Sequence, residues 1–363
     1  MNICIIGGGL TSLSLAKILV KKKINVCFYH KNKIKNLSSS RTIGISKDNL
    51  EFFRKEIHKI PKNFFWEIKK IEIYSEKLKK ENLIRFEKDE ANLFYMVKND
   101  ELYKSLINKI SKNKFFKKKL IKKNLFNLDL LKRYDLIINC DSNNFLSKKF
   151  FTKKFDKEYD NLAYTTVIKH KNIKNNIATQ IFTKNGPIAF LPISNVKTSI
   201  VCSLDNKNKN YKDSEVLVLI NKNNPKYQIQ KTLKLSCFKL RSSILRNYHH
   251  KNILAFGDLL HRIHPLAGQG FNMTIRDIKI LSGIIQNKID LGIQLDSSIL
   301  LDFEKETKIK NFLFSNSVDF IYEIFNLDKK IKNKKFNEIL KIIGKNKKVT
   351  NFLIKLADKG LNF

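Results

Sequence analysis

The chain of 363 residues contains little cysteine, and its cysteines follow no pairing pattern. The five are Cys4, Cys27, Cys140, Cys202 and Cys237, and no two of them form a CxxC pair. An odd number without such a pattern argues against a disulfide framework and suits a reducing compartment. Cys4, Cys27 and Cys140 lie in apolar, strand-like runs, so we expect them to act as small buried hydrophobic residues.

Long apolar runs and linkers are also missing. No uninterrupted apolar run reaches the ~18 residues of a membrane span. The chain opens on a strand-like segment, Asn2 to Ile6, and we expect no signal peptide. No internal repeat and no Pro/Gly/Ser-rich linker divides the chain. We therefore expect a cytoplasmic protein of one large or two smaller domains, with peripheral contact to the inner face of the cytoplasmic membrane left open.

Acidic residues are scarce, with 33 Asp and Glu against 71 Lys and Arg, which gives a formal charge of +38. Such a balance is typical of proteins that bind nucleic acid or an anionic membrane. Lys, Asn and Ile are raised together throughout the chain, however, so Lys is the default surface residue of a biased composition. No arginine-rich arm and no nucleic-acid motif accompanies the charge. We expect no nucleic-acid partner, and weak attraction to anionic lipid stays open.

The first 30 residues have the pattern of a β-α-β unit. A strand over Asn2–Ile6, a glycine turn, a helix over Leu10–Lys21 and a strand over Ile24–Tyr29 predict a parallel sheet. The turn fits the G-x-G-x-x-G fingerprint of dinucleotide-binding folds. Gly7 permits the tight turn, Gly9 lets the backbone approach a pyrophosphate, and Ser12 takes the third position, where a small residue is needed. The alternative is a glycine-rich turn that holds no ligand.

The fingerprint normally ends in an acidic residue that binds a ribose hydroxyl, and here the second strand ends in His30. A neutral imidazole still accepts one hydrogen bond but brings no negative charge. The alternative for His30 is an ordinary exposed histidine.

Beyond the first unit, the pattern predicts a second, β-rich region and a helical end. Short strands are expected at 71–74, 83–86 and 134–140, and a helix at 102–110. An antiparallel sheet is expected from strand-like runs at 163–168, 178–182, 188–191 and 199–204. From Gln269 onward the chain is expected to be helical, and its last stretch, about 336–363, mixes apolar residues with Lys as an amphipathic helix does.

The most specific segment runs from Gly257 to Asn272 and reads GDLLHRIHPLAGQGFN. A buried strand, Asn252 to Phe256, leads into Gly257-Asp258, and a Gly-Gln-Gly segment then opens a helix expected over 271–285. This segment resembles the second flavin-binding motif of the FAD-dependent aromatic-ring hydroxylases. It is most similar to the hydroxylases of ubiquinone biosynthesis, whose pattern reads roughly GDAAH-x-x-HPLAGQG-x-N.

The resemblance implies a set of residues that bind FAD. Asp258 would accept hydrogen bonds from the ribityl chain, Pro265 would stiffen the loop, and Gly268 and Gly270 would let backbone lie against a flat ring. The dipole of the following helix would favour negative charge on the ring. The full cofactor set that we predict is Gly7, Gly9, Ser12, His30, Arg41, Asp141, Asp258, Pro265, Gly268, Gln269, Gly270 and Asn272.

Two members of this set depend strongly on the resemblance. Arg41 occupies the place where the family carries an arginine near the cofactor, although in so basic a chain it also reads as a surface residue. Asp141 matches the Asp of the family's Asp-Gly motif, but Ser142 replaces the Gly, and serine resists a positive φ. That departure puts the reduction step in doubt more than flavin binding. The alternative for Asp141 is a simple turn residue.

His261 and His264 have an i, i+3 spacing that invites a metal interpretation, but no nearby Cys or His completes a site, and we expect no metal. His264 and Pro265 are instead expected near the flavin ring. No side chain stands out as the base that would activate a phenol. The segment from Gln180 to Pro192 resembles the family's F-x-x-x-GPLA-x-LP hairpin, and its apolar residues suit either an apolar substrate or a core.

Taken together, the resemblance implies an α/β fold with a Rossmann-like, three-layer FAD-binding domain, an inserted antiparallel β substrate domain and a helical C-terminus. We expect the discontinuous FAD-binding domain over 1–70, 96–158 and 250–300, the substrate domain over 71–95 and 159–249, and the helical region over 301–363.

The implied activity is hydroxylation of the aromatic ring of a polyprenylphenol in ubiquinone biosynthesis, through a flavin hydroperoxide. FAD would be the cofactor, NAD(P)H a transient electron donor, and other ubiquinone-biosynthesis proteins would be partners. Two alternatives stay open: a hydroxylase of another aromatic compound, and a non-catalytic accessory protein that keeps the fold. The absence of an acid at His30 and of a glycine at Ser142 favours the accessory role, and the intact 257–272 motif argues against it.

Overall fold

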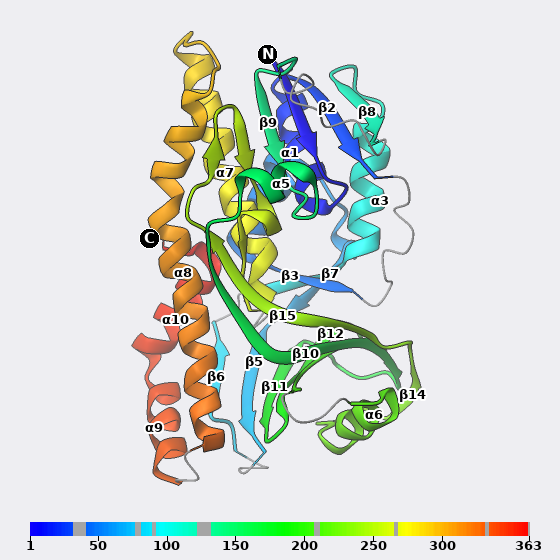
Figure 1. Cartoon of the computed structure of the whole chain (residues 1–363). Coiled ribbons are helices and arrows are strands. Elements are labelled where there is room, and N and C mark those ends of the chain that lie inside the picture. The colour runs from blue at the N-terminus through cyan, green and yellow to red at the C-terminus, as the bar shows by residue number, and fades with distance from the viewer. Residues whose placement is uncertain are drawn as a thin grey trace.

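A computed structural model describes residues 1–31, 41–76, 81–88, 92–121, 132–206, 211–264, 268–330 and 334–361. Figure 1 shows a parallel sheet at one end of the molecule, a larger antiparallel sheet at the other, and a long helix along one side of both. This is the expected α/β architecture with an inserted β region and a helical end.

The parallel sheet is built from segments that are far apart in the sequence. Its strand order is β16-β17-β9-β1-β2-β8, and every pair is parallel except β16 with β17. The strands are β1 (Asn2–Ile6), β2 (Asn25–His30), β8 (Phe116–Leu120), β9 (Leu136–Asn139), β16 (His249–His250) and β17 (Ile253–Ala255). The central strand β1 is apolar on both faces, because Ile3, Cys4, Ile5 and Ile6 are all buried. Such a strand is stable only where helices cover both faces of the sheet.

The helix that follows the first glycine turn packs against two other helices. Helix α1 (Leu10–Lys21) begins directly after β1 and contacts α3 (Asn99–Ile110) and α7 (Gln269–Asp290). The strand and helix predicted for residues 2–21 are therefore confirmed with the same bounds.

The second sheet has nine strands, in the order β18-β15-β10-β13-β12-β11-β5-β6, with β14 paired to β10. All pairs are antiparallel except β11 with β5. The strands are β5 (Lys70–Ser75), β6 (Ile84–Glu87), β10 (Lys154–His170), β11 (Ile177–Thr183), β12 (Gly186–Ser194), β13 (Lys197–Asp205), β14 (Ile229–Thr232), β15 (Ser236–Leu245) and β18 (His261–Arg262). Helix α6 (Asp213–Lys222) covers one face through Val216 and Ile220, which are buried with Ile188 and Phe190.

A three-stranded antiparallel sheet, in the order β3-β7-β4, joins the two larger sheets. Its strands are β3 (Thr42–Ser46), β4 (Phe65–Ile68) and β7 (Phe94–Lys98), and Met96 and Ile68 pack against Ala178 of the nine-stranded sheet. Short helical segments complete this part: α2 (Lys47–Phe52), the π-helix η1 (Phe53–Ile57), η2 (Lys62–Phe64), α5 (Phe145–Phe150) and η3 (Gly257–Leu259).

After α7 the described chain is helical, as expected, with α8 (Ser298–Lys330), α9 (Lys334–Lys345) and α10 (Lys347–Lys359). Helix α8 ties the nine-stranded sheet to the rest, because Tyr159 of β10 donates a hydrogen bond to Asp319 and Asn161 donates one to Tyr322. Within the described residues, no helix combines the length and apolar character needed to cross a bilayer.

Candidate flavin site

The first glycine turn has the geometry that a dinucleotide fingerprint requires. Gly7 has a φ of +128°, and a Cβ there would lie 2.9 Å from Ser12 Oγ and 3.2 Å from Cys140 Cβ. Ser12 is fully buried, so its small size serves the close approach of α1 to the sheet. Gly9 is the N-cap of α1 with no side-chain cap, and the space beside it is open to 4 Å. The first N–H groups of α1 therefore face a place where an anion fits.

His30 lies beside this turn and is buried, so the alternative of an exposed histidine was wrong. Its side chain is 5 % exposed, and its Cβ is the nearest atom to a Cβ built on Gly8, at 3.5 Å. Nδ1 lies 3.0 Å from the Lys31 carbonyl oxygen, and Nε2 is buried without a hydrogen-bond partner among the described residues. Burial lowers the pKa of His30. The neutral ring thus has one polar atom free for a ligand.

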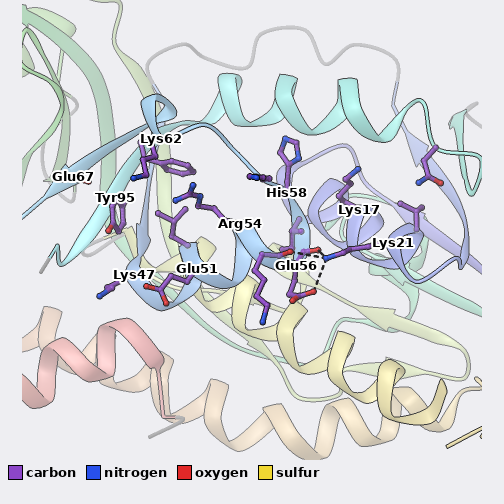
Figure 2. A pocket seen from close by; sticks show the side chains of 17 residues that line it. Lys17, Lys21, Lys47, Glu51, Arg54, Glu56, His58, Lys62, Glu67 and Tyr95 are labelled. Atoms are coloured by element: carbon purple, nitrogen blue, oxygen red, sulfur yellow. Dashed lines mark hydrogen bonds and ion pairs between the residues drawn. The ribbon is translucent and has the colours of Figure 1, made fainter. Parts of the chain in front are cut away.

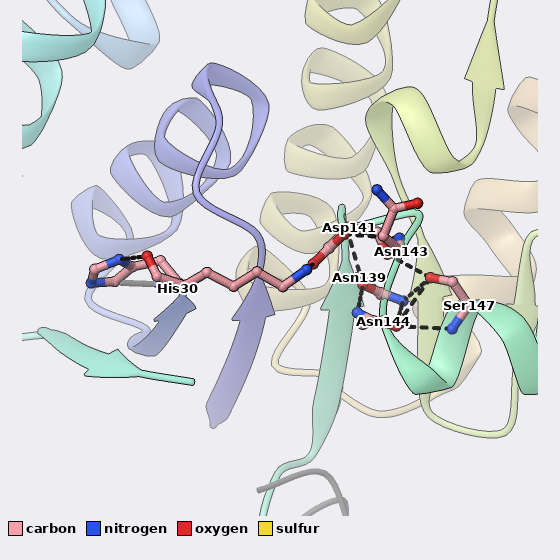
Figure 3. A network of polar contacts seen from close by, with 7 residues as sticks. His30, Asn139, Asp141, Asn143, Asn144 and Ser147 are labelled. Carbon is pink, nitrogen blue, oxygen red and sulfur yellow. Dashed lines mark hydrogen bonds and ion pairs between the residues drawn. The ribbon is translucent and has the colours of Figure 1, made fainter. Parts of the chain in front are cut away.

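The segment after β9 meets the end of β2 across the same edge of the sheet. Lys31 Nζ lies 3.0 Å from Asp141 Oδ2, while Asp141 Oδ1 accepts a hydrogen bond from the Asn143 N–H (Figure 3). Asp141 is therefore both a turn residue and one half of an ion pair. Ser142 does not adopt a positive φ, since in the described chain only Lys23 and Lys251 do so among non-glycine residues. Ser142 therefore does not carry the strain of a positive φ that its place in the glycine position led us to expect.

The second motif is fixed directly against the first. Gly257 follows β17 with a φ of +62°, and a Cβ there would lie 2.6 Å from Thr11 Cγ2 of α1. Asp258, the next residue, is exposed and lies in η3. The contact between Thr11 and Gly257 brings the two glycine motifs, 246 positions apart, to the same edge of the parallel sheet.

The start of α7 forms the next wall. Gly268 is its N-cap in the left-handed conformation, with a φ of +65°, and a Cβ there would lie 3.6 Å from the Gly44 N of β3. Gly270 has open space around it, and Gln269 Oε1 is buried without a partner in the described structure. Pro265, together with Leu266 and Ala267, lies outside the described residues.

Asn272, predicted to bind the cofactor, has its amide occupied by protein. Nδ2 donates to the Gly44 carbonyl at 2.9 Å and Oδ1 accepts from the Ser46 N–H at 2.9 Å. The side chain is 1 % exposed and fastens α7 to β3. Arg41 lies just before β3 with an exposed side chain, and its carbonyl accepts a hydrogen bond from the Asn99 N–H at 3.1 Å.

The two histidines of the 257–272 segment have different surroundings. His261 Nε2 lies 2.5 Å from Asp277 Oδ2, and Asn311 donates to the other oxygen of that carboxylate. His264 is stacked on Tyr322 with a centroid distance of 4.1 Å and meets Tyr159 edge-on at 4.9 Å. Both ring nitrogens of His264 are buried without a partner among the described residues, and burial lowers its pKa to about 3. No sequence signal pointed to Asp277, Tyr159 or Tyr322, because each contacts its histidine across a long separation in the chain.

The hairpin that begins at Gly186 mainly serves the core of the nine-stranded sheet. Ile188 and Phe190 are fully buried and pack toward α6, whereas Leu191 points to the opposite face, against the cluster of Met96 and Ala178. Of the two uses that the sequence left open for these apolar residues, a core is the one observed for Ile188 and Phe190.

A large cavity in the described structure lies elsewhere. It has a volume of about 960 Å³ and lies between α1, η1 and the three-stranded sheet (Figure 2). None of the predicted cofactor residues lines it. Its lining holds seven Lys and Arg against three Glu, nearly the ratio of the whole chain, 71 to 33. The cavity therefore gives no sign of a preferred ligand, and we assign the site by the glycine motifs instead.

The residues at the carboxyl edge of the parallel sheet fit FAD. The open N-terminus of α1 suits a pyrophosphate, the free Nε2 of His30 suits a ribose hydroxyl, and the open backbone at Gly270 suits a flat ring. Ligands of open α/β sheets bind at this edge. The fit rests on backbone groups and on one imidazole nitrogen that has no partner within the described part of the chain.

Comparisons with known proteins agree with this geometry. Residues 151–290 match the family described as FAD binding domain. Among solved structures, p-nitrophenol 4-monooxygenase PnpA from Pseudomonas putida has a TM-score of 0.78 at 10% identity, over 98% of each chain. Klebsiella pneumoniae HpxO, crystallised with FAD and uric acid, has a TM-score of 0.73 at 12% identity, over 98% of this chain and 96% of that one. The fold is thus that of the flavin monooxygenases.

Among curated proteins, ubiquinone biosynthesis monooxygenase COQ6 of Dictyostelium discoideum is 27% identical over 40% of this chain and 37% of its own. The 3-demethoxyubiquinol 3-hydroxylase of Escherichia coli is 30% identical over 40% of this chain and 39% of its own. The matches span less than half the length of these relatives. With the matched FAD binding domain at 151–290, they make this chain similar to FAD-binding monooxygenases, and the solved structures show that it has their fold.

Proposed function

We propose that this protein is an FAD-dependent monooxygenase that hydroxylates the aromatic ring of a polyprenylphenol intermediate in ubiquinone biosynthesis. The observation that carries the proposal is the contact between the two glycine motifs at Thr11 and Gly257, which brings distant segments together at one edge of the parallel sheet. The similarity to the ubiquinone-biosynthesis enzymes supports the substrate class. Bound FAD would supply the reduction and the activation of oxygen.

In this proposal the residues of the chain bind and orient the cofactor. The N–H groups at the start of α1 hold the phosphates, and His30 Nε2 binds the adenosine ribose. Asp258, exposed beside the open edge, accepts hydrogen bonds from the ribityl chain. The N-terminus of α7, with Gly268 and Gly270, faces the ring and favours negative charge there by roughly 0.3–2 kcal/mol.

Lys31 would exchange partners when FAD binds. Its Nζ is exposed enough to move, with 59 % of the side chain accessible, and its present partner Asp141 is a single carboxylate. A pyrophosphate next to α1 is a stronger acceptor for an ammonium group. We propose that Lys31 contributes the positive charge that the phosphates need, and that NAD(P)H binds transiently as electron donor.

The site of action would be the cytoplasmic face of a membrane. The substrate is apolar, and the surface is strongly basic, with a formal charge of +38, which favours anionic lipid by electrostatic attraction. Peripheral contact of this kind, and association with other ubiquinone-biosynthesis proteins, belong to the proposal.

Two alternatives have specific support. The solved neighbours include an enzyme named for p-nitrophenol, which favours a hydroxylase of another aromatic compound. The ion pair that joins Lys31 to Asp141 across the cofactor edge favours an accessory protein that keeps the fold without binding flavin.

The test is the visible absorption spectrum of the purified protein, before and after adding FAD. We expect flavin bands that remain after gel filtration and that are weakened in an Asp258→Ala variant. Asp213→Ala, which removes an exposed carboxylate at the start of α6, is the matched control and should bind FAD normally. A folded protein that takes up no FAD would favour the accessory role. Flavin binding without oxygenation of prenylphenols would favour a different aromatic substrate.

A further inference from the structure

Arg276 is a buried cation that forms no ion pair among the described residues. It lies about two turns along α7 from Gly268, and its side chain is 8 % exposed. Both terminal nitrogens, Nη1 and Nη2, are buried and have no hydrogen-bond partner among the described residues. A guanidinium group keeps its charge at all ordinary pH values, so burying two of its nitrogens unpaired costs several kcal/mol unless something binds them.

The guanidinium is held in a fixed orientation. The ring of Phe314 from α8 covers one face, with the Arg276 Cζ 4.3 Å from the ring centroid. Gly360, just after α10, lies so close to the guanidinium that a Cβ there would come within 3.0 Å of Nε and 3.1 Å of Cζ. The guanidinium is thus held between an aromatic ring and the backbone, and Nη1 and Nη2 remain without hydrogen-bond partners in the described structure.

Arg276 borders a small cavity. The cavity has a volume of about 20 Å³ and is lined by Arg276, Asp277, Ile280, Thr307, Lys310, Asn311, Phe314, Gly360 and Leu361. The volume is enough for one water-sized particle. The cavity therefore places a single small ligand against a preorganised pair of N–H₂ groups.

The electrostatics of the lining favour an anion over a water molecule. Asp277 is the one carboxylate in the lining, and its oxygens already accept from His261 and Asn311. Thr307 donates its hydroxyl hydrogen to the Phe303 carbonyl. Arg276 and Lys310 supply two cations, and in the described structure no carboxylate forms an ion pair with Arg276. Burial lowers the pKa of Arg276 to about 10, and the charges of Asp277, Asp358 and Asp48 act against that shift. Since none of these carboxylates forms an ion pair with Arg276 in the described structure, water would satisfy the N–H₂ groups without a counter-charge in direct contact.

We propose that the cavity between α7, α8 and α10 binds a small monovalent anion of the size of chloride, held by Nη1 and Nη2 of Arg276. The anion would tie α10 to α7. The end of α10 also reaches the wall of the flavin site, because Asp358 accepts hydrogen bonds from Ser46 Oγ and the Asp48 N–H. Anion binding would therefore stabilise the C-terminal helices against the base of that site, independently of the catalytic activity.

The first experiment compares thermal unfolding of the full chain in sodium chloride and sodium gluconate at equal ionic strength. We expect the unfolding midpoint to rise with chloride and then to saturate. At a chloride concentration ten times the dissociation constant, the folding equilibrium constant should be about 11-fold higher. Arg276→Met, which keeps the length of the side chain, should lose the difference between the two salts. Lys310→Met, an exposed position at the rim, should weaken it.

The second experiment is crystallographic and does not depend on the folding of any variant. Wild-type crystals grown in sodium bromide should show an anomalous peak within hydrogen-bond distance of Nη1 and Nη2. Equal midpoints in chloride and gluconate, or a map with water or protein atoms on the guanidinium edge and no bromide there, would overturn the proposal. Saturation only at molar chloride would mark an adventitious ion and would also overturn it.

Discussion

The buried ring of His264 predicts a specific sensitivity to acid. The side chain is 1 % exposed, lies between Tyr322 and Tyr159, and has neither nitrogen paired in the described structure. Protonation would place a charge among aromatic rings with no acceptor for either N–H. This is why burial lowers the pKa of His264 to about 3, against an ordinary 6.5.

The sign and size of the effect follow from proton linkage. Below pH 6.5 the unfolded chain binds a proton at this histidine, whereas the folded chain does not until about pH 3. The unfolded state then carries one proton more, so the free energy of unfolding falls as the pH falls through this window. The slope is about 1.4 kcal/mol per pH unit, which sums to roughly 5 kcal/mol over the whole window.

The assay is urea unfolding from pH 8 to pH 4 of the wild type and a His264→Phe variant, which keeps a flat ring between the two tyrosines. We expect the wild type to lose stability more steeply below pH 6.5, by about 1 kcal/mol per pH unit. The measurement at pH 8 is the internal control, since there both states of the wild type are neutral at this position. Parallel curves for the two proteins below pH 6.5 would refute the reasoning.

Three further substitutions test the nine-stranded sheet and the candidate site. Gly186→Ala should lower the free energy of unfolding in urea by at least about 1–3 kcal/mol, because φ is +132° and the new Cβ would overlap a backbone oxygen of β13. The control is Gly283→Ala, inside α7 with open space around it, which should raise the free energy of unfolding by about 0.5–1 kcal/mol. Asn272→Ala should cost about 2–4 kcal/mol and weaken FAD binding in a fluorescence titration, because it leaves buried partners on β3 unpaired. Lys31→Met should raise the dissociation constant for FAD roughly tenfold, while Lys21→Met should not. Unchanged binding in Lys31→Met would remove Lys31 from the phosphate site.

The fold was predictable where its signals are local. A strand, a glycine turn and a helix occupy consecutive residues, so the pattern at 2–21 gave the bounds of β1 and α1 directly. Helix α7 was expected over 271–285, in a chain expected to be helical from Gln269 onward, and the structure extends it to Gln269–Asp290. Gly268 precedes it with the left-handed φ that glycine alone adopts cheaply. The strands expected at 163–168, 178–182, 188–191 and 199–204 lie within β10, β11, β12 and β13, but β14 and β15 were not predicted. The parallel pairing of β11 with β5 was not predicted either, since it depends on which distant strand lies alongside.

The candidate site was predictable as a set of segments and much less as a set of contacts. His30 illustrates the limit, because its burial depends on Gly8 and on the neighbouring strands rather than on its own sequence context. Lys31 gave no signal in a chain where lysine is the commonest surface residue, and only the position of Asp141 singles it out. Asn272 matched the family pattern, yet its hydrogen bonds show that it holds β3 in place.

The two departures from the family pattern weaken the site less than the sequence suggested. The turn that carries Ser142 has no positive φ, so a glycine is not required there in this backbone. His30 has one buried nitrogen without a partner among the described residues, and in the proposed site it would accept the hydrogen bond expected of the missing acid, without the acid's charge. The remaining contacts expected with FAD come from backbone N–H groups and glycines, which side-chain substitutions elsewhere do not remove. The enzyme and the accessory protein therefore differ in whether FAD takes Lys31 away from Asp141. Flavin binding by a Lys31→Met variant tests that step.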